Sequence, residues 1–413
     1  MSSMFQLRPH QKSALEAMLL HAKGIVVAPT GAGKSIIAIY DTIRHFALGN
    51  QTVVVVAPRL LLAQQLCSEF MEHITDASVM HVHSAKDCNY FATTKPDEIG
   101  DWCENTQGNK LIFTTYNSLQ RIVDAGIHVN AIYFDEAHNS VKKSFFDGTR
   151  ILSKYADHCY FFTATPKYSS TPKKPGMNDR EVYGKIIFNV PAPELIANGS
   201  ILPPKINAMN IGSARDKDQN AAERDCMTLL DTILNEEHMD KVLVAAPNTK
   251  VLIRMIAETD FMTEVQSYGY DVLWITAKYG AFINNTKISR EEFFNKISDF
   301  GKDPNKKFIV LHYSILSEGI SVPGLTSLVM MRQMNVIEMC QSIGRVIRLH
   351  LDDIKAIQNG QIKAGDLNSY TKSFGLIHVP VYSNTGISTV RRLQSVVDTV
   401  FVEGQPAISV IKK

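Results

Sequence analysis

The sequence predicts an α/β fold with two tandem domains, each a parallel β-sheet flanked by helices. First, 413 residues exceed what one compact core usually holds and suit two domains of about 200 residues each. Second, short β-branched runs alternate with helical patterns throughout the chain, which is the rhythm of βαβ units. Third, a proline-rich stretch, residues 188–204, interrupts this rhythm near the middle.

In the first half, short apolar runs predict the strands of one parallel sheet. These runs are residues 24–28, 52–57, 110–114, 131–134 and 159–163. Each is followed by a loop of small or polar residues, as expected at the ends of strands in βαβ units. We therefore assign residues 1–200 to a first domain.

After the proline-rich stretch, which we interpret as a linker or hinge, the alternation starts again. Strands are expected at residues 241–246, 271–275, 307–311 and 326–330, with helices at 290–297 and 336–346 between them. From about residue 374 an extension with a helix near 389–400 is expected to pack on this half. The second domain is therefore predicted to span residues 201–413.

The composition is that of an ordinary globular protein. Lys and Arg number 43 against 41 acidic residues, so any surface that attracts nucleic acid must be local. The longest apolar runs fall far short of the ~20 residues that cross a bilayer, and no signal-peptide pattern is present at residue 1. We expect a soluble, cytoplasmic protein that does not contact membranes.

The six cysteines contain no C-x-x-C pair, which argues against a disulfide framework and against a ribbon-type zinc site. His81, His83, Cys88 and Cys103 have side chains that suit zinc, but their last spacing is long and irregular. Reduced thiols without a metal are the favoured interpretation, and zinc is the alternative.

A glycine-rich loop follows the first predicted strand. Its residues are Ala28, Pro29, Thr30, Gly31, Ala32, Gly33, Lys34 and Ser35. They fit the phosphate-binding pattern G-x-x-x-x-G-K-[ST], with alanine in place of the opening glycine. Main-chain N–H groups of such a loop attract anions, Lys34 can reach the outer phosphates, and Ser35 can ligate Mg²⁺. A purely structural glycine turn would not require lysine and serine at these positions.

The predicted strand 131–134 ends in Asp135, Glu136, Ala137 and His138. Open α/β sheets bind ligands at the carboxyl ends of their strands, so Asp135 can hold the magnesium shell. Glu136 can orient or deprotonate an attacking water. Taken alone, this motif could be an ordinary charged turn. Together with the glycine-rich loop, the motif predicts a nucleotide site.

These two motifs resemble motifs I and II of the superfamily 2 DEAD/DEAH-box helicases. The resemblance implies two RecA-like P-loop NTPase domains that hydrolyse ATP, with Mg²⁺ as cofactor, in the cleft between them. It also makes His138, the last residue of the D-E-A-H box, part of the nucleotide site. The segment Leu7 to Gln11 resembles the adenine-reading segment of the family, which implies adenine contacts by Arg8 and Gln11 and an aromatic cover from Phe5.

Further motifs of the family follow in order. The segment that contains Thr163 and Thr165 resembles motif III, which couples the nucleotide site to the nucleic-acid site. Gln341, Arg345 and Arg348 fit the Q-x-x-G-R-x-x-R pattern of motif VI, and on a helix this spacing puts all three on one face. By resemblance they are catalytic, with the arginines stabilising the γ-phosphoryl transition state.

The remaining motifs are weaker. Residues 317–323 resemble motif V and imply that Gly319 lies near the nucleotide, although Ser321 stands where relatives usually have aspartate. Three strand-end segments resemble motifs Ia, Ib and IV, whose contacts grip the nucleic-acid backbone and carry no sequence information. Their candidate residues are Pro58, Arg59, Thr114, Thr115, Tyr116, Pro247, Asn248 and Thr249.

Residues 93–99, 183–184 and 201–204 look like the motor of type III restriction enzymes and related phage DNA helicases. This closer resemblance covers most of residues 5–350 and favours DNA over RNA. It implies an ATPase that unwinds, translocates along or remodels single-stranded, duplex or branched DNA. An RNA-stimulated helicase, or an ATP-switched DNA-binding subunit with protein partners in a larger complex, are the alternatives.

Overall fold

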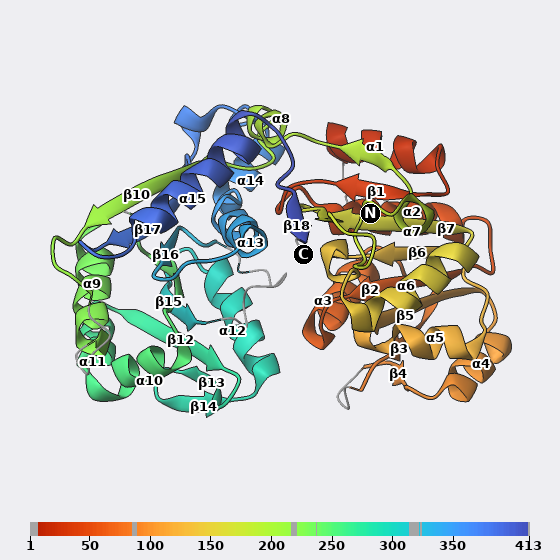
Figure 1. The fold of residues 1–413 in the computed structure, drawn as a ribbon, viewed down its shortest axis with the longest axis horizontal. Coiled ribbons are helices and arrows are strands. Elements are labelled where there is room, and N and C mark those ends of the chain that lie inside the picture. The colour runs from red at the N-terminus through yellow and green to blue at the C-terminus, as the bar shows by residue number, and fades with distance from the viewer. Residues whose placement is uncertain are drawn as a thin grey trace. The chain divides into compact units, whose positions relative to one another are not determined.

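The computed structural model describes residues 7–84, 89–215, 221–236, 238–313, 322 and 324–411. Contacts divide the chain into two compact units, which Figure 1 shows. The first comprises Met1–Val190 together with Pro406–Lys413, and the second comprises Pro191–Gln405. The expected boundary was a single division after residue 200. The units instead divide after Val190, and Pro406–Lys413 at the end of the chain belongs to the first unit.

The first unit is built on an eight-stranded sheet in the order β4-β3-β5-β2-β6-β7-β1-β9, in which every described pairing is parallel. Its strands are β1 (Lys23–Val27), β2 (Thr52–Ala57), β3 (Ala77–Val82), β4 (Phe91–Ala92), β5 (Asn109–Thr115), β6 (Ala131–Phe134), β7 (His158–Thr163) and β9 (Ile186–Asn189). The predicted strands of this half are confirmed, with bounds shifted by one residue at most.

Helices cover both faces of this sheet. Val53 and Val55 of β2 pack with α1 (Pro9–Leu19), α2 (Lys34–Phe46) and α3 (Leu60–Met71). Val54 and Val56 point the other way, because side chains alternate along a strand, and they pack with α4 (Pro96–Asn105), α5 (Leu119–Ala125), α6 (Lys143–Tyr155) and α7 (Arg180–Tyr183). Burial on both faces explains why these strands are continuous apolar runs.

The second unit has its own eight-stranded sheet, in the order β10-β17-β16-β11-β15-β12-β13-β14. Its strands are β10 (Pro204–Asn210), β11 (Lys241–Ala245), β12 (Tyr270–Thr276), β13 (Gly280–Ile283), β14 (Thr286–Ile288), β15 (Lys307–His312), β16 (Ser327–Met330) and β17 (Gly375–Val381). In this order, all neighbouring strands from β10 across the sheet to β12 pair in parallel. The strands β13 and β14 pair in antiparallel fashion with their neighbours and form one edge of the sheet. The predicted fold class is therefore confirmed, with a mostly parallel second sheet.

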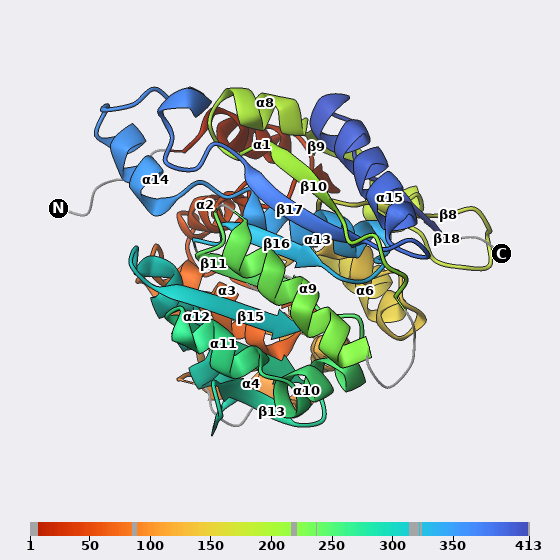
Figure 2. The ribbon, with the colours of Figure 1, turned by 90° about the vertical axis from the view of Figure 1, so that its left-hand side faces the viewer.

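Helices also flank the second sheet. Figure 2 shows α9 (Ala221–Asn235), α10 (Thr249–Glu258) and α11 (Phe261–Ser267) on one face of the sheet. Apolar residues of these helices share a core with β11 and β12. Figure 1 shows α12 (Arg290–Lys302) and α13 (Val336–Val346) on the other side. The helices α14 (Leu351–Gln358) and α15 (Ile387–Val397) complete this unit together with α8 (Ala192–Ala197).

The proline-rich stretch is structured. It contains the end of β9, the helix α8 and the start of β10. Pro191 is the N-cap of α8 and Pro193 lies in its first turn, where a missing N–H costs no helical hydrogen bond. The main-chain oxygen of Pro203 accepts a hydrogen bond from Gly375, the first residue of β17. Residues 188–204 thus contain regular structure, and the boundary between the two units, after Val190, falls within this stretch.

The last described residues pair with the first unit. The strand β18 (Ser409–Ile411) lies parallel to β8 (Lys167–Ser169) in a two-stranded sheet. This differs from the expectation that the whole extension from residue 374 packs on the second half. No helix formed by the residues that the structure describes is long and apolar enough to span a membrane.

Candidate functional site

The glycine-rich loop runs from the end of β1 to the start of α2. Gly31 and Gly33 have φ angles of +92° and +77°, a region that glycine enters at little cost. A Cβ atom on Gly33 would also lie 2.6 Å from the Nε2 atom of Gln11, so the end of that flexible side chain would have to move if position 33 carried a side chain. The loop therefore delivers Lys34 and Ser35 as the first two residues of α2.

Lys34, Ser35 and Asp135 line one small cavity of about 10 Å³. The ammonium group of Lys34 also donates a hydrogen bond of 3.3 Å to the main-chain oxygen of Ala28. The structure thus brings together residues of the two motifs that the sequence assigns to phosphate and magnesium.

Asp135 follows the last residue of β6. Burial, and then the adjacent Glu136 carboxylate, raise the pKa of Asp135 to about 7, while the positive charge of Lys34 opposes this rise. A nearby cation strongly stabilises the charged form of a carboxyl group in such surroundings and so opposes the rise of its pKa. Ser35 and Asp135 fit the way proteins usually hold Mg²⁺, with one or two side-chain oxygens while water and substrate phosphates fill the other positions.

Glu136 has a φ angle of +45°, which is unusual for a residue with a side chain. This conformation turns the chain from β6 into a short helical turn, Ala137–Asn139, and leaves the Glu136 side chain buried. One carboxylate oxygen of Glu136 lies 3.4 Å from the Nδ1 atom of His138. Strain of this kind, of order 1–3 kcal/mol, is often found at functional sites.

His138 connects this turn to the end of β7. Its Nδ1 atom lies 3.2 Å from the hydroxyl oxygen of Thr163. That hydroxyl oxygen also accepts a hydrogen bond of 3.1 Å from the main-chain N–H of Thr165. The motifs that resemble II and III are therefore joined by side-chain contacts from Glu136 to Thr165.

The segment that resembles the adenine reader packs on the glycine-rich loop. Pro9 begins α1, and the main-chain N–H of Arg8 donates to the side-chain oxygen of Gln11 over 2.9 Å. The side-chain amide of Gln11 donates to the main-chain oxygen of Gly33 over 3.4 Å. A ring nitrogen of His10 lies 2.8 Å from the main-chain oxygen of Ala32. The sequence motifs assign no role to His10. Phe5 lies outside the described residues.

In the second unit, Gln341 and Arg345 lie on α13, and both side chains are buried. The guanidinium of Arg345 donates to the main-chain oxygen of Gln341 over 3.0 Å. Arg348 lies beyond the helix, which ends at Val346. The expected alignment on one helical face therefore applies to the first two residues and not to Arg348. Gly319 and most of the segment that resembles motif V lie outside the described residues.

Lys372 holds the end of α13, a role that sequence reasoning missed. Its ammonium group donates to the main-chain oxygens of Leu325, Val346 and Arg348 over 2.5, 2.5 and 3.1 Å. Burial lowers the pKa of Lys372 to about 7, against the opposing charge of Asp353. No sequence signal marks this lysine, because its acceptors are main-chain atoms distant along the chain.

The candidate nucleic-acid residues differ in their surroundings. Arg59 is exposed at the start of α3, whereas Pro58 is buried. Thr114, Thr115 and Tyr116 are buried, and the Tyr116 hydroxyl donates to the main-chain oxygen of Asp135 over 2.9 Å. These three side chains therefore face the interior of the first unit, and their assignment stays a prediction.

Residues 247–249 surround the start of α10. Asn248 caps this helix by accepting a hydrogen bond of 2.9 Å from the main-chain N–H of Val251. Thr249 is the first residue of the helix and lines a surface groove. Pro247 precedes the cap and is partly exposed.

Within the described ranges, no group of three or more His, Cys, Asp or Glu side chains could hold a metal ion. Ring nitrogens of His81 and His83 lie 3.1 Å apart, and burial lowers the pKa of both residues. Cys88, the third member of the predicted alternative zinc cluster, lies outside the described residues.

Two family models match the chain. The model of the type III restriction enzyme res subunit matches residues 4–168, and the model of the helicase conserved C-terminal domain matches residues 225–350. A protein of Sulfolobus islandicus filamentous virus, named "Putative helicase 22", is 22% identical over 375 residues, which cover 84% of this chain and 62% of that protein. This chain thus spans less than two thirds of the length of its viral relative.

Solved structures share the fold. The ATP-dependent Type ISP restriction-modification enzyme LlaBIII bound to DNA matches with a TM-score of 0.71 and 14% identity, over 98% of this chain and 31% of that one. Dbp5 of S. cerevisiae, bound to RNA and ADP BeF3, matches with a TM-score of 0.55 and 14% identity, over 99% of this chain and 95% of that one. The two family models, which match separate parts of the chain, and the viral relative support a superfamily 2 helicase that resembles the motor of type III restriction enzymes, and the solved structures share its fold.

Proposed function

We propose that this chain is a DNA motor, which couples hydrolysis of Mg-ATP to unwinding, translocation along or remodelling of DNA. One observation supports the proposal most. Side-chain contacts run from Glu136 through His138 to Thr163, beside the cavity that Lys34 and Asp135 line. Such a connection allows a change at the nucleotide to reach a neighbouring strand end.

The residues of the first unit would divide the chemistry among them. The loop 29–33 and Lys34 bind the phosphates of ATP, and Ser35 and Asp135 hold Mg²⁺, which neutralises phosphate charge when bound. Glu136 orients the attacking water and accepts its proton. The Gln11 side chain, anchored beside the loop, contacts the adenine edge.

In the second unit, Gln341, Arg345 and Arg348 are proposed to complete catalysis. The two arginines supply positive charge to the γ-phosphoryl group in the transition state, an effect typically worth about 10³ to 10⁵ in rate. Lys372 fixes the main chain on both sides of Ile347 and so positions Arg348. Residues 58–59, 114–116 and 247–249 are proposed to contact the phosphate backbone of the polymer.

DNA is the favoured polymer. The similar LlaBIII and LlaGI structures are described as complexes with DNA and with a DNA substrate mimic. Dbp5, whose match has a lower TM-score, is bound to RNA and supports the alternative of an RNA-stimulated helicase. The third alternative is a DNA-binding motor subunit of a larger complex, which uses ATP as a switch and depends on partner proteins.

The test is ATP hydrolysis by the full chain without polymer and with single-stranded DNA, duplex DNA, branched DNA or RNA. Glu136→Gln is the inactive control. We expect DNA to stimulate hydrolysis, and the stimulation to be lost in the control. Stronger stimulation by RNA would favour the first alternative. Absence of hydrolysis with every polymer would contradict the motor and favour the partner-dependent switch.

A further inference from the structure

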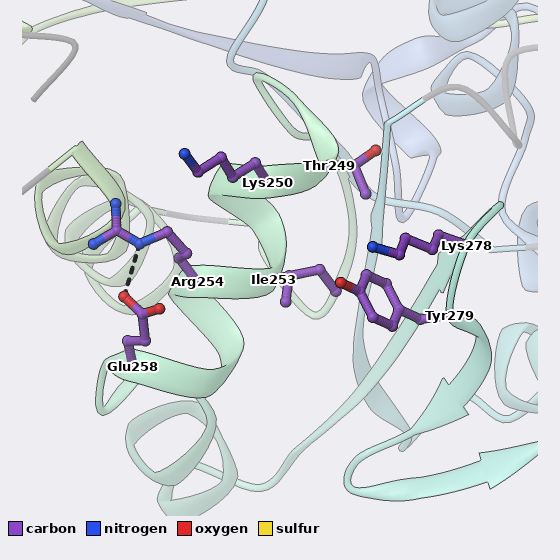
Figure 3. Close-up of a pocket in the computed structure, with 7 residues that line it drawn as sticks. All are labelled: Thr249, Lys250, Ile253, Arg254, Glu258, Lys278 and Tyr279. Carbon is purple, nitrogen blue, oxygen red and sulfur yellow. Dashed lines mark hydrogen bonds and ion pairs between the residues drawn. The ribbon is translucent and has the colours of Figure 1, made fainter. Parts of the chain in front are cut away.

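The second unit carries a surface groove outside the candidate nucleotide site. The groove has a volume of about 780 Å³ and is called the hairpin groove below. It is lined by Thr249, Lys250, Ile253, Arg254, Glu258, Lys278 and Tyr279. Figure 3 shows α10 forming one wall, with Lys278 and Tyr279 projecting toward it from the turn between β12 and β13.

The turn is held firmly at its base. The indole ring of Trp274 on β12 stacks on the ring of Phe282 on β13, with centroids 3.9 Å apart. The main-chain N–H of Tyr279 donates to the hydroxyl of Thr276 over 3.0 Å, and Gly280 has a φ angle of +92°. A hairpin braced in this way presents the tyrosine ring at low entropic cost, since little ordering remains to be done on binding.

The groove is positively charged although the chain as a whole is nearly neutral. Lys250, Arg254 and Lys278 contribute three positive charges against the single carboxylate of Glu258, which pairs with Arg254 at 2.7 Å. The ammonium group of Lys278 lies 5.2 Å from the centre of the Tyr279 ring, and 41% of this tyrosine is exposed. Lysines beside an exposed aromatic ring suit a strand of phosphates and unpaired bases.

We infer that the hairpin groove binds single-stranded DNA, with phosphates near Lys250 and Lys278 and one base stacked on Tyr279. The inference rests on the proposed DNA motor and goes beyond the backbone contact expected of Thr249. Within a duplex each base already stacks on its neighbours, so the ring has no free base face to engage. The hairpin groove therefore makes the second unit prefer unpaired DNA to duplex.

The experiment uses the full chain and measures dissociation constants for a labelled oligothymidylate and for a blunt duplex over a salt series. Tyr279→Ala should weaken binding of the single strand about tenfold, because stacking by one aromatic side chain typically accounts for a loss of this size. Binding of the duplex should change less than about twofold, and Tyr279→Phe should bind as the parent does. Lys250→Ala should lower the slope of log K against log salt by about 0.7.

The first unit offers a matched control. Lys154 and Tyr155 on α6 form the same kind of contact, with the ammonium group 5.4 Å from the ring centre and the tyrosine 68% exposed. Tyr155→Ala should leave binding of the oligothymidylate unchanged. The inference is overturned if Tyr279→Ala binds as the parent does, if it weakens duplex and single strand alike, or if Tyr155→Ala has the same effect.

Hydrolysis by the parent protein separates this inference from the proposed function. If DNA stimulates hydrolysis by the parent and Tyr279→Ala binds oligothymidylate as the parent does, the role of the groove is contradicted and the DNA motor is supported. If Tyr279→Ala selectively loses single-strand binding but DNA does not stimulate hydrolysis by the parent, the role of the groove is supported and the DNA motor is contradicted. Failure of the parent to bind either DNA would overturn both.

Discussion

The Nδ1 atom of His138 lies 3.2 Å from the hydroxyl oxygen of Thr163, which joins residues 25 positions apart in the chain. The same nitrogen lies 3.4 Å from a carboxylate oxygen of Glu136. A neutral imidazole that carries its proton on Nδ1 can donate to only one of these partners strongly at a time. His138 can therefore shift between them when the charge around Glu136 changes.

Thr163→Val should uncouple hydrolysis from the polymer. The change removes the oxygen that receives Thr165 N–H and faces His138, but it keeps the shape of the side chain. We expect ATP binding to persist and DNA-stimulated hydrolysis to fall about tenfold, a barrier increase of about 1.4 kcal/mol. Stimulation is measured as the ratio of rates with and without DNA. Thr149→Val, which removes another buried hydroxyl, on α6, is the control and should keep the parent ratio. Equal ratios in both variants would refute the coupling role.

Glu136→Gln and Lys34→Ala should fail in different ways. Glutamine keeps the size of Glu136 but cannot accept a proton, so hydrolysis should fall about 10²- to 10⁴-fold while ATP still binds. Alanine at position 34 removes the charge that faces the phosphates, so ATP affinity should fall as well. Binding of a fluorescent ATP analogue and single-turnover hydrolysis separate the two effects. Turnover by Glu136→Gln at the parent rate would rule out the proposed base.

Acid should destabilise the second unit partly through His312. Burial, and then the charges of Arg345 and Arg332, lower the pKa of His312 to about 3, compared with 6.5 for an unperturbed histidine. Between these values the unfolded chain binds the extra proton, so stability falls as the pH drops below about 6.5, by at most about 1.4 kcal/mol per pH unit. His312→Leu should remove this share of the slope.

The measurement is the free energy of unfolding in urea at pH 7.5, 6.5, 5.5 and 4.5. Between pH 6.5 and 4.5 the His312→Leu variant should lose about 2 kcal/mol less stability than the parent protein. A parental slope in His312→Leu would show that this imidazole does not titrate on unfolding.

Local chemistry made much of the fold and of the nucleotide site predictable. The strands β2 and β6 and the helix α13 have the predicted bounds, because a central parallel strand is a continuous apolar run and a helix shows an apolar stripe. The glycine-rich loop and Asp135 share a cavity, as expected when strands of one sheet end at the same edge. Each of these signals is contained in a few neighbouring residues of the sequence.

Features that depend on distant partners could not be predicted. The strands β10 and β17 pair with each other, but their polar residues and prolines hide the apolar alternation. Arg348 was expected on the helical face of Gln341 and Arg345, but α13 ends before it. The turn that presents Tyr279 belongs to an antiparallel hairpin near the sheet edge, where the sequence shows only three residues, Ala277 to Tyr279, between two apolar runs.

Lys372→Met should destabilise the second unit and disturb the end of α13. Methionine retains an unbranched apolar stem but leaves the main-chain oxygens of Leu325, Val346 and Arg348 without this donor. Each buried acceptor left unsatisfied typically costs about 1–3 kcal/mol, and relief of the buried charge offsets part of the sum. We expect a net loss of about 2 kcal/mol at pH 7, measured by urea unfolding. Lys363→Met, at an exposed lysine, should change stability by less than about 0.5 kcal/mol.

The pH dependence of this loss provides a second check on Lys372. Burial lowers the pKa of Lys372 to about 7, below the 10.5 of an unperturbed lysine. Between these values the unfolded chain binds more protons than the folded one, so this lysine makes the parent protein more stable as the pH rises. Methionine cannot titrate, so the deficit of Lys372→Met relative to the parent should grow by about 2 kcal/mol from pH 7 to pH 9. A deficit that stays constant over this range would mean that Lys372 remains charged when folded, with its three main-chain acceptors outweighing the cost of burial.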